Sequence, residues 1–247
     1  MAEGSAVLLV SHGSPEKESN EQVLKLRDRL RAIRRGWRVE AAFLEREHPS
    51  FHDVLLDLLA EGISMIAVLP VFLFPGRHTS EDIPAEIADA HRKRPQAKIV
   101  LGPPLSEYVD LAEMLAAKIP PGAVATNPPR VILAAAGAVA IENRRTLEEL
   151  VAKVQRRAGA SARYAYLDHG EPLIEEVFRE AAIEKPPAVV ILPCILFPGM
   201  YMRALTAKVA TFKAAHGQRL KITLEDPFGL NHRLVLALEK EAAKLLA

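Results

Sequence analysis

The chain has 247 residues, of which 49% are hydrophobic and 26% charged, and its formal net charge is +1. These values are typical of a soluble globular protein, and the balanced charge argues against a nucleic-acid partner. The longest apolar runs, 65–74 and 188–197, contain prolines and are much shorter than the roughly 20 residues of a membrane helix. The single cysteine, Cys194, allows no internal disulfide, so we expect a cytoplasmic protein that does not enter a membrane.

The first half of the chain alternates strand patterns with helix patterns. Strands are predicted at 6–10, 38–44, 65–74 and 98–101, where apolar or alternating runs end in glycine, proline or polar residues. Helices are predicted at 20–35, 51–60, 80–92 and 107–118. Ser19 and Ser50 are the expected N-caps of the first two helices, and Pro84 falls in the first turn of the third. This alternation predicts a parallel sheet with helices on both faces.

The second half of the chain repeats the first at an offset of 123 to 124 residues. Segment 131–137 repeats 7–13, segment 166–172 repeats 43–49, and segment 192–201 repeats 69–78. Between the halves, 119–129 has the proline-rich composition of a semi-rigid linker. We therefore predict an α/β protein of two similar doubly wound lobes with parallel four-stranded sheets, at 1–122 and 130–247, that arose by internal duplication. Such a fused pair can work as a monomer.

Two strands of the first half end in glycine-bearing turns that each carry one histidine, His12 and His78. The carboxyl ends of parallel strands border the ligand crevice, so we expect both imidazoles there. The second half keeps the apolar strands and the glycines but has Ala136 and Tyr201 at the matching positions. This joint loss indicates one shared function, confined to the first half. Each histidine could also simply cap its loop or bond a backbone carbonyl.

Two imidazoles that face each other across a cleft suit a borderline divalent cation such as Co²⁺, Fe²⁺, Ni²⁺ or Zn²⁺. Glu45, at the end of the second predicted strand, is the expected third ligand. Its counterpart in the second half is Asp168, and an ordinary surface or helix-entry acid is an equal alternative. Intrinsic affinities follow the same order in most sites, so the ligand set does not choose the metal.

These motifs resemble those of a known family. Leu-Leu-Val-Ser-His-Gly-Ser at 8–14, Ala-Phe-Leu-Glu at 42–45, and Pro-Val-Phe-Leu-Phe-Pro-Gly-Arg-His at 70–78 with Asp82-Ile-Pro84 are similar to the sirohydrochlorin chelatases, the class II tetrapyrrole chelatases. The resemblance covers the whole chain, because the second half matches the degenerate repeat of the long family members. One departure is Ser11, where the family commonly has glycine.

The resemblance implies a lyase that inserts Co²⁺ or Fe²⁺, with Ni²⁺ as a further candidate, into sirohydrochlorin or a related tetrapyrrole. The reaction would need no nucleotide and would serve cobalamin or sirohaem biosynthesis. The family's two histidines map onto His12 and His78 and its carboxylate onto Glu45. The same three residues would hold the metal and carry the catalysis.

Sirohydrochlorin is a polycarboxylate, so cationic side chains near the cleft are expected to bind it. The candidates are Lys17 on the first loop, Arg46 beside Glu45, Arg77 beside His78, and Arg203 from the second lobe. For each of them a solvated surface charge is the alternative.

Two other functions fit parts of the sequence. Leu-Val-Ser-His-Gly also resembles the start of the histidine phosphatases, but Ser11 stands where their arginine contacts phosphate, and the His78 loop would have no role. A non-catalytic metal or tetrapyrrole carrier would need the same cleft and the same ligands as a chelatase. Turnover, not the residue pattern, separates a carrier from an enzyme.

Overall fold

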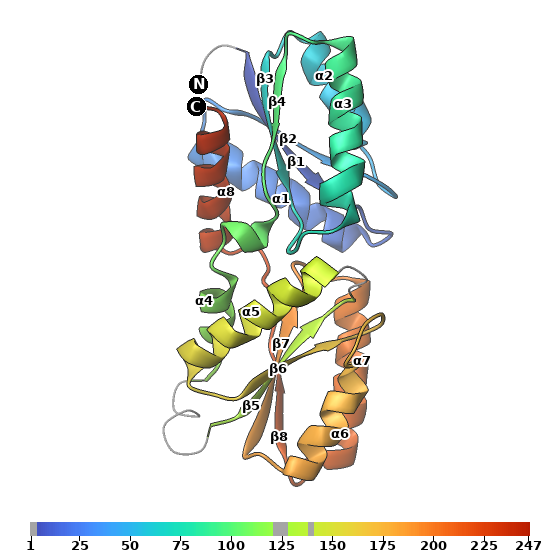
Figure 1. Cartoon of the computed structure of the whole chain (residues 1–247), viewed down its shortest axis with the longest axis vertical. Helices are drawn as coiled ribbons and strands as arrows, with labels where there is room; N and C mark the ends of the chain where they lie inside the picture. The colour runs from blue at the N-terminus through green and yellow to red at the C-terminus, as the bar shows by residue number, and fades with distance from the viewer. Residues whose placement is uncertain (1–3, 121–127, 138–140) are drawn as a thin grey trace. The chain divides into compact units, whose positions relative to one another are not determined.

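The computed structural model of the chain describes residues 4–120, 128–137 and 141–247 (Figure 1). The chain forms two compact units, one of residues 1–109 with 230–247 and the other of residues 110–229. Each unit contains a sheet of four parallel strands, which confirms the predicted α/β fold of two similar lobes. No helix in the described part of the chain has the length and apolar character needed to cross a membrane.

The sheet of unit 1 has the strand order β2-β1-β3-β4. Its strands are β1 (Ser5–Ser11), β2 (Arg38–Phe43), β3 (Met65–Pro70) and β4 (Lys98–Leu101). Because β1 lies between β2 and β3, residues 6–10 are fully buried. This position explains the continuous apolar run, since a strand covered on both faces has no polar side.

Helices cover both faces of this sheet (Figure 1). The helices of unit 1 are α1 (Lys17–Ile33), α2 (Phe51–Ala60), α3 (Ile83–Lys93) and α8 (His232–Leu245), with a π-helical turn η1 (His78–Asp82) before α3 and a 3-10 turn η2 (Leu105–Glu107) after β4. Leu55 of α2 and Ile83 of α3 pack with Leu8 of β1 in one core cluster. On the opposite face, α8 packs against α1 and β3.

Unit 2 repeats this architecture with the strand order β6-β5-β7-β8. Its elements are α4 (Leu111–Ala116), β5 (Arg130–Ala135), α5 (Ile141–Ala158), β6 (Ala162–Tyr166), α6 (Ile174–Glu184), β7 (Ala188–Cys194), α7 (Met200–His216) and β8 (Lys221–Leu224). Cys194 is buried at the end of β7, and burial raises the pKa of its thiol, so this cysteine is an unreactive core residue.

The strand registers confirm the repeat residue by residue. Val7 pairs with Val39 on one side and Ala67 on the other. Val131 pairs in the same way with Ala162 and Val190. The offset is therefore 124 residues in the first strand of each repeat and 123 in the next two, as the sequence motifs predict.

The compact units do not coincide with the two sequence repeats. Helix α4 follows β4 in the first repeat but packs against α5 of unit 2, whereas α8 follows β8 in the second repeat but packs in unit 1. The units thus divide at 109/110 and 229/230, whereas the predicted lobes, 1–122 and 130–247, follow the boundaries of the repeats. Linker composition marks where one repeat ends, and the destination of each terminal helix depends on packing. The centre of the predicted linker, 121–127, lies outside the described residues.

Several element boundaries differ from the sequence prediction. Helix α1 begins at Lys17, and its N-cap is Glu16 in place of Ser19, with no side-chain hydrogen bond at the cap. Strand β3 ends at Pro70, and the carbonyl of Phe72 accepts a hydrogen bond from the Leu105 amide. The predicted strand 65–74 is therefore too long, because the chain turns toward η2 after Pro70. The predicted helix 107–118 is split between η2 and α4.

Helix α2 forms at the predicted residues. The Ser50 side chain accepts a hydrogen bond from the Asp53 amide, as expected for an N-cap. Pro84 is the second residue of α3, directly after the π-helical turn η1.

Candidate metal centre

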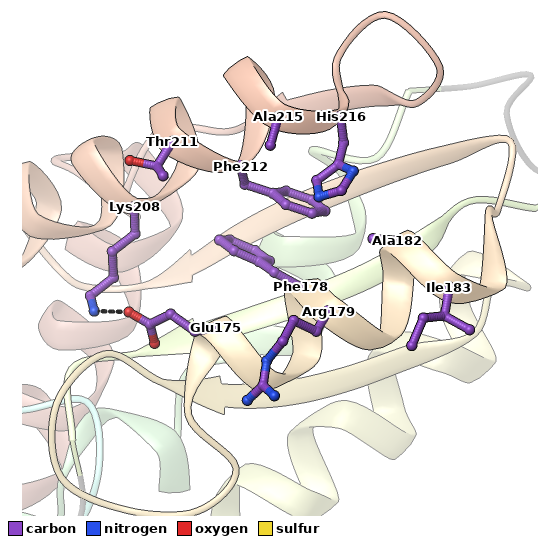
Figure 2. A pocket seen from close by; sticks show the side chains of 10 residues that line it. All are labelled: Glu175, Phe178, Arg179, Ala182, Ile183, Lys208, Thr211, Phe212, Ala215 and His216. Carbon is purple, nitrogen blue, oxygen red and sulfur yellow. Dashed lines mark hydrogen bonds and ion pairs between the residues drawn. The ribbon is translucent and has the colours of Figure 1, made fainter.

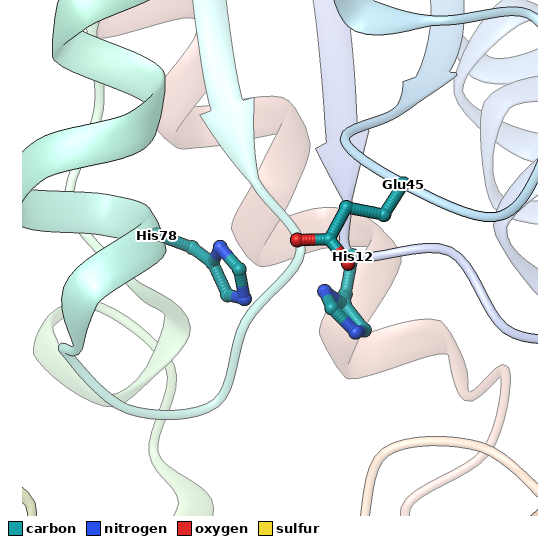
Figure 3. Close-up of side chains that lie close together, drawn as sticks. All are labelled: His12, Glu45 and His78. Carbon is teal, nitrogen blue, oxygen red and sulfur yellow. The ribbon is translucent and has the colours of Figure 1, made fainter.

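His12, Glu45 and His78 lie at the carboxyl edge of the unit 1 sheet. His12 follows β1, Glu45 follows β2, and His78 begins η1 after the loop that leaves β3. One potential ligand atom from each side chain lies within 4.8 Å of the others. Figure 3 shows the three side chains gathered in one place. The three residues that the sequence predicts as ligands are thus brought together from segments far apart in the chain.

Backbone hydrogen bonds hold His12 and Glu45 next to each other just after the ends of their strands. The Leu44 amide donates to the Ser11 carbonyl, and the Glu45 amide donates to the His12 carbonyl, each at 2.9 Å. The parallel pairing of β1 with β2 therefore continues up to the two side chains. Gly13 permits this close approach, because a Cβ at this position would lie 1.8 Å from the Glu45 carbonyl oxygen.

Replacing Gly13 with alanine is expected to destabilise unit 1 by about 2–4 kcal/mol, through this steric overlap and a φ of +89°. Gly36→Ala is the matched control, because a Cβ there meets no atom within 4 Å. Chemical denaturation followed by circular dichroism compares the two variants with the unmodified protein. Equal stabilities for the two variants would contradict the assigned role of Gly13.

The two imidazole rings lie close to each other. Their centroids are 4.7 Å apart with an angle of 40° between the planes, and the ring of Phe72 lies 5.6 Å from that of His78. His78 Nδ1 is 2.7 Å from Asp82 Oδ2, which leaves Nε2 as the ring nitrogen of His78 available to a ligand. The side chains in Figure 3 point into a common space, as metal ligands would.

His12 lies in surroundings that favour its neutral form. Its side chain is half-buried, and its Nδ1 atom is buried with no hydrogen-bond partner among the described residues. Burial lowers the pKa of His12 below its ordinary value of 6.5, and the neighbouring His78 lowers it further, while Glu45 acts in the opposite direction. A neutral imidazole is the form that binds metal ions.

In the metal-free protein, we expect the midpoint of the His12 NMR titration to lie below 6.5. The folded state then loses stability as the pH falls from 6.5 toward that midpoint, because only the unfolded chain takes up the proton. Glu45→Gln is expected to lower the midpoint further, and Arg46→Gln to raise it, since Arg46 opposes protonation. A midpoint at or above 6.5 would contradict this description of the site.

Asn20 ties together the two loops that follow β1 and β2. Its side chain is 4% exposed, accepts from the Ser14 amide at 2.9 Å, and donates to the Ser14 carbonyl at 2.7 Å and to Glu47 Oε2 at 2.6 Å. Hydrogen bonds from the His48 amide and from Asn20 lower the pKa of Glu47. Sequence reasoning missed Asn20. The repeat offered one indication: the second half has an arginine at the matching position 144, so Asn20, like the two histidines, is confined to the first half.

The predicted cationic residues occupy different places. Arg46 Nε lies 3.9 Å from Oε2 of the candidate ligand Glu45, and Arg77 Nε lies 3.6 Å from both Glu81 Oε2 and Asp82 Oδ1. Lys17 is the exposed first residue of α1, a helical position that differs from the predicted loop. Arg203 is an exposed residue of α7 in unit 2.

The carboxyl edge of the unit 2 sheet lacks this ligand set. The residues that match His12, Glu45 and His78 are Ala136, Asp168 and Tyr201. Among the described residues, only the group in unit 1 combines three potential metal ligands.

Unit 2 has a groove of about 520 Å³ between α6 and α7 (Figure 2). Phe178 and Phe212 stack at its floor with ring centroids 4.3 Å apart, and an ion pair joins Lys208 to Glu175 beside it. The groove offers mainly apolar surface, and its one histidine, His216, lies against Phe212 with ring centroids 5.1 Å apart.

The sequence model of the CbiX family matches residues 6–120 and, a second time, residues 130–245. The chain belongs to the CbiX family. Its two family matches correspond to the two structural repeats, and the group of His12, Glu45 and His78 lies in the first of them.

Named relatives and solved structures match most of this CbiX chain. A sirohydrochlorin cobaltochelatase of Priestia megaterium is 26% identical over 96% of this chain and 78% of its own length. A sirohydrochlorin ferrochelatase of the same organism is 27% identical over 81% of this chain and 76% of its own length. The structure of SirB from Bacillus subtilis with Fe³⁺ is 23% identical, with a TM-score of 0.85 over 98% of this chain and 96% of that one. The last likeness confirms the fold.

Proposed function

We propose that this CbiX protein is a sirohydrochlorin chelatase, which inserts Co²⁺ or Fe²⁺ into the tetrapyrrole. The observation that carries the proposal is the convergence of His12, Glu45 and His78 within 4.8 Å at the edge of a parallel sheet. The relatives named for cobalt and iron insertion are 26% and 27% identical to the chain, so both metals are candidate substrates. Ni²⁺ suits the same ligand set.

Metal insertion exchanges two pyrrole N–H protons for one dication. The ion must first lose water, and the site offers two imidazole nitrogens and one carboxylate, a set that would leave coordination positions open for the macrocycle. As each metal–nitrogen bond to the macrocycle forms, the departing protons need acceptors. His12, His78 and Glu45 are the basic groups nearest to that exchange, so we assign them both metal handling and proton acceptance.

The substrate's carboxylates require cations outside the ligand set. We assign this role to Arg46 and Arg77, which adjoin Glu45 and Asp82, together with Lys17 and Arg203. The two arginine side chains are 57% and 77% exposed, so their attraction to a carboxylate is partly screened by solvent and salt. Weakening of substrate binding at high salt is the expected sign of this contribution.

We further propose that the protein works in the cytoplasm as a monomer, without nucleotide, membrane or nucleic-acid partners. The single buried cysteine is compatible with a reducing compartment, and the balanced charge offers no basic excess for nucleic acid. The two fused repeats provide in one chain what a dimer of single repeats would provide. The product would serve cobalamin or sirohaem synthesis, according to which metal enters.

The test is an anaerobic assay in which sirohydrochlorin and Co²⁺ or Fe²⁺ are mixed with catalytic amounts of protein. The absorption of the tetrapyrrole reports insertion, and the same mixture without protein gives the uncatalysed rate. Acceleration over many turnovers per protein molecule supports a chelatase. Binding of metal or tetrapyrrole with no acceleration would identify a carrier, and would overturn the proposed function.

A further inference from the structure

We propose that Asp82 is a positioning residue that holds the His78 ring in the tautomer and orientation needed to take up the metal. This inference rests on the proposed function, because it assigns to Asp82 a task at the same site. Its starting observation is the 2.7 Å separation between His78 Nδ1 and Asp82 Oδ2.

The local backbone places these two side chains next to each other. His78 and Asp82 are the first and last residues of the π-helical turn η1, and the Ile83 amide donates to the His78 carbonyl. Pro84 follows at once, and a proline ring does not fit against the carbonyl four residues earlier in a regular helix. Pro84 thus disfavours regular α-helical bonding at the place where the wider π-helical turn occurs. Turns of this kind often occur at functional sites.

The chemistry of the pair fixes the state of the ring. An ionised carboxylate only accepts hydrogen bonds, so the His78 nitrogen that faces Asp82 must be the N–H donor. The lone pair of the neutral ring then lies on Nε2, the nitrogen free to bind a metal. Carboxylates that bond the distal nitrogen of a metal-binding histidine orient the ring and strengthen it as a ligand.

The second carboxylate oxygen of Asp82 has its own partner. Arg77 Nε lies 3.6 Å from Oδ1, whereas His78 Nδ1 faces Oδ2. Contacts at both oxygens restrict rotation of the carboxylate, so the acceptor stays in line with His78 Nδ1. Asp82 is about one-third exposed, so it is not a core residue and solvent or a ligand can reach it.

The second repeat provides an internal control for this assignment. Tyr201 corresponds to His78 at the offset of 123 residues. Beyond the π-helical turn, the buried residues Ile83 and Ala90 of α3 match Leu205 and Phe212 of α7 at an offset of 122, so Asp82 corresponds to Ala204 and the fold accepts an apolar side chain there. The repeat that lacks the histidine also lacks the aspartate, which is the pattern expected when the two residues share a single task.

Calorimetric titration with Co²⁺, in the absence of tetrapyrrole, tests the assignment through binding alone. Asp82→Ala is expected to raise the Kd about 10- to 100-fold, the usual effect of losing such a partner. Asp82→Asn is expected to stay much closer to the unmodified protein, because its amide oxygen still accepts from Nδ1. Asp89→Ala is the matched control: it removes an exposed carboxylate of α3 that pairs with Arg92 and Lys93.

The tautomer of His78 gives a second measurement that a purely structural role would not change. Long-range ¹H–¹⁵N spectra of the imidazole are expected to show the Nδ1–H form in the unmodified protein and in Asp82→Asn, and a mixture of tautomers in Asp82→Ala. The second repeat carries Ala204 at the position that matches Asp82 in burial, so Asp82→Ala is expected to fold. Should it fold poorly, Asp82→Leu, which has no acceptor for Nδ1, replaces it.

The outcomes separate this inference from the proposed function. Unchanged Co²⁺ affinity and an unchanged tautomer in a folded Asp82→Ala variant would overturn the role of Asp82, even if the unmodified protein accelerates insertion. If the unmodified protein binds Co²⁺ without accelerating insertion, the chelatase proposal fails. In that case a weakened Kd and altered tautomer in Asp82→Ala still support the role of Asp82 in metal capture.

Discussion

Replacing either His12 or His78 with alanine is expected to lower the catalysed rate of metal insertion by at least about 100-fold, because loss of a ligand should cost no less than loss of its outer-shell partner. With one imidazole gone, the site retains a single nitrogen and the Glu45 carboxylate. The ion would be held more weakly, and a proton acceptor would be lost at the same step. Initial rates in the anaerobic assay measure the effect for each variant.

These alanine substitutions, and His78→Tyr as an alternative at the second position, are expected to leave the folded state intact. The second repeat folds with Ala136 and Tyr201 at the matching positions, so His12→Ala and His78→Tyr give unit 1 the residues that unit 2 already carries. His91→Ala, on the exposed side of α3, controls for loss of a histidine outside the site. Full activity in both site variants would contradict the assignment, whereas a large fall in Tm would indicate a structural role.

The position of the site could be predicted from the sequence because it depends on strand order and on apolar runs. The run at 6–10 is buried on both faces, and only a central strand of a parallel sheet has that environment. Once β1, β2 and β3 are recognised as parallel neighbours, the residues that follow them must lie at one edge. The internal repeat then distinguishes His12 and His78 from ordinary loop histidines, because Ala136 and Tyr201 show that the fold does not need them.

The supporting residues could not be predicted in the same way. Asp82 stands four residues after His78, a spacing common on any helix, and only the observed rotamers show the bond between them. Asn20 lies in a polar stretch, yet its side chain is buried because two loops fold over it. Contacts of this kind depend on the paths of the loops, and hydrophobic periodicity does not predict those paths.

The exchange of α4 and α8 was equally inaccessible to sequence reasoning. An amphipathic pattern shows that a helix has an apolar face, but it does not name the surface on which that face packs. Because the two repeats present similar sheets, either one could receive either terminal helix. The physical consequence is that the unit with the candidate metal ligands is completed by the last 18 residues of the chain, 230–247.

Removing residues 230–247 is therefore expected to unfold unit 1, although its four strands and α1 to α3 all remain. Leu234, Val235 and Leu238 of α8 are at most 2% exposed, and α8 packs against α1 and β3. Burial of such side chains contributes about 1.5–3 kcal/mol each, so their loss approaches the 5–15 kcal/mol by which a typical domain is stable. The truncation also removes Glu239, the ion-pair partner of Arg34.

Two fragments turn this expectation into a direct comparison of repeat and unit. The first is 1–122, the complete first repeat, and the second joins 1–109 to 230–247 through a flexible glycine–serine linker. Because only the second contains the whole of unit 1, it alone is expected to unfold cooperatively and to bind Co²⁺ as the full chain does. Near-ultraviolet circular dichroism and calorimetry measure the two properties. A monomeric 1–122 fragment with full stability and full Co²⁺ affinity would show that α8 is dispensable. Either α4 would then cover α1 and β3 in its place, or these elements would need no covering helix.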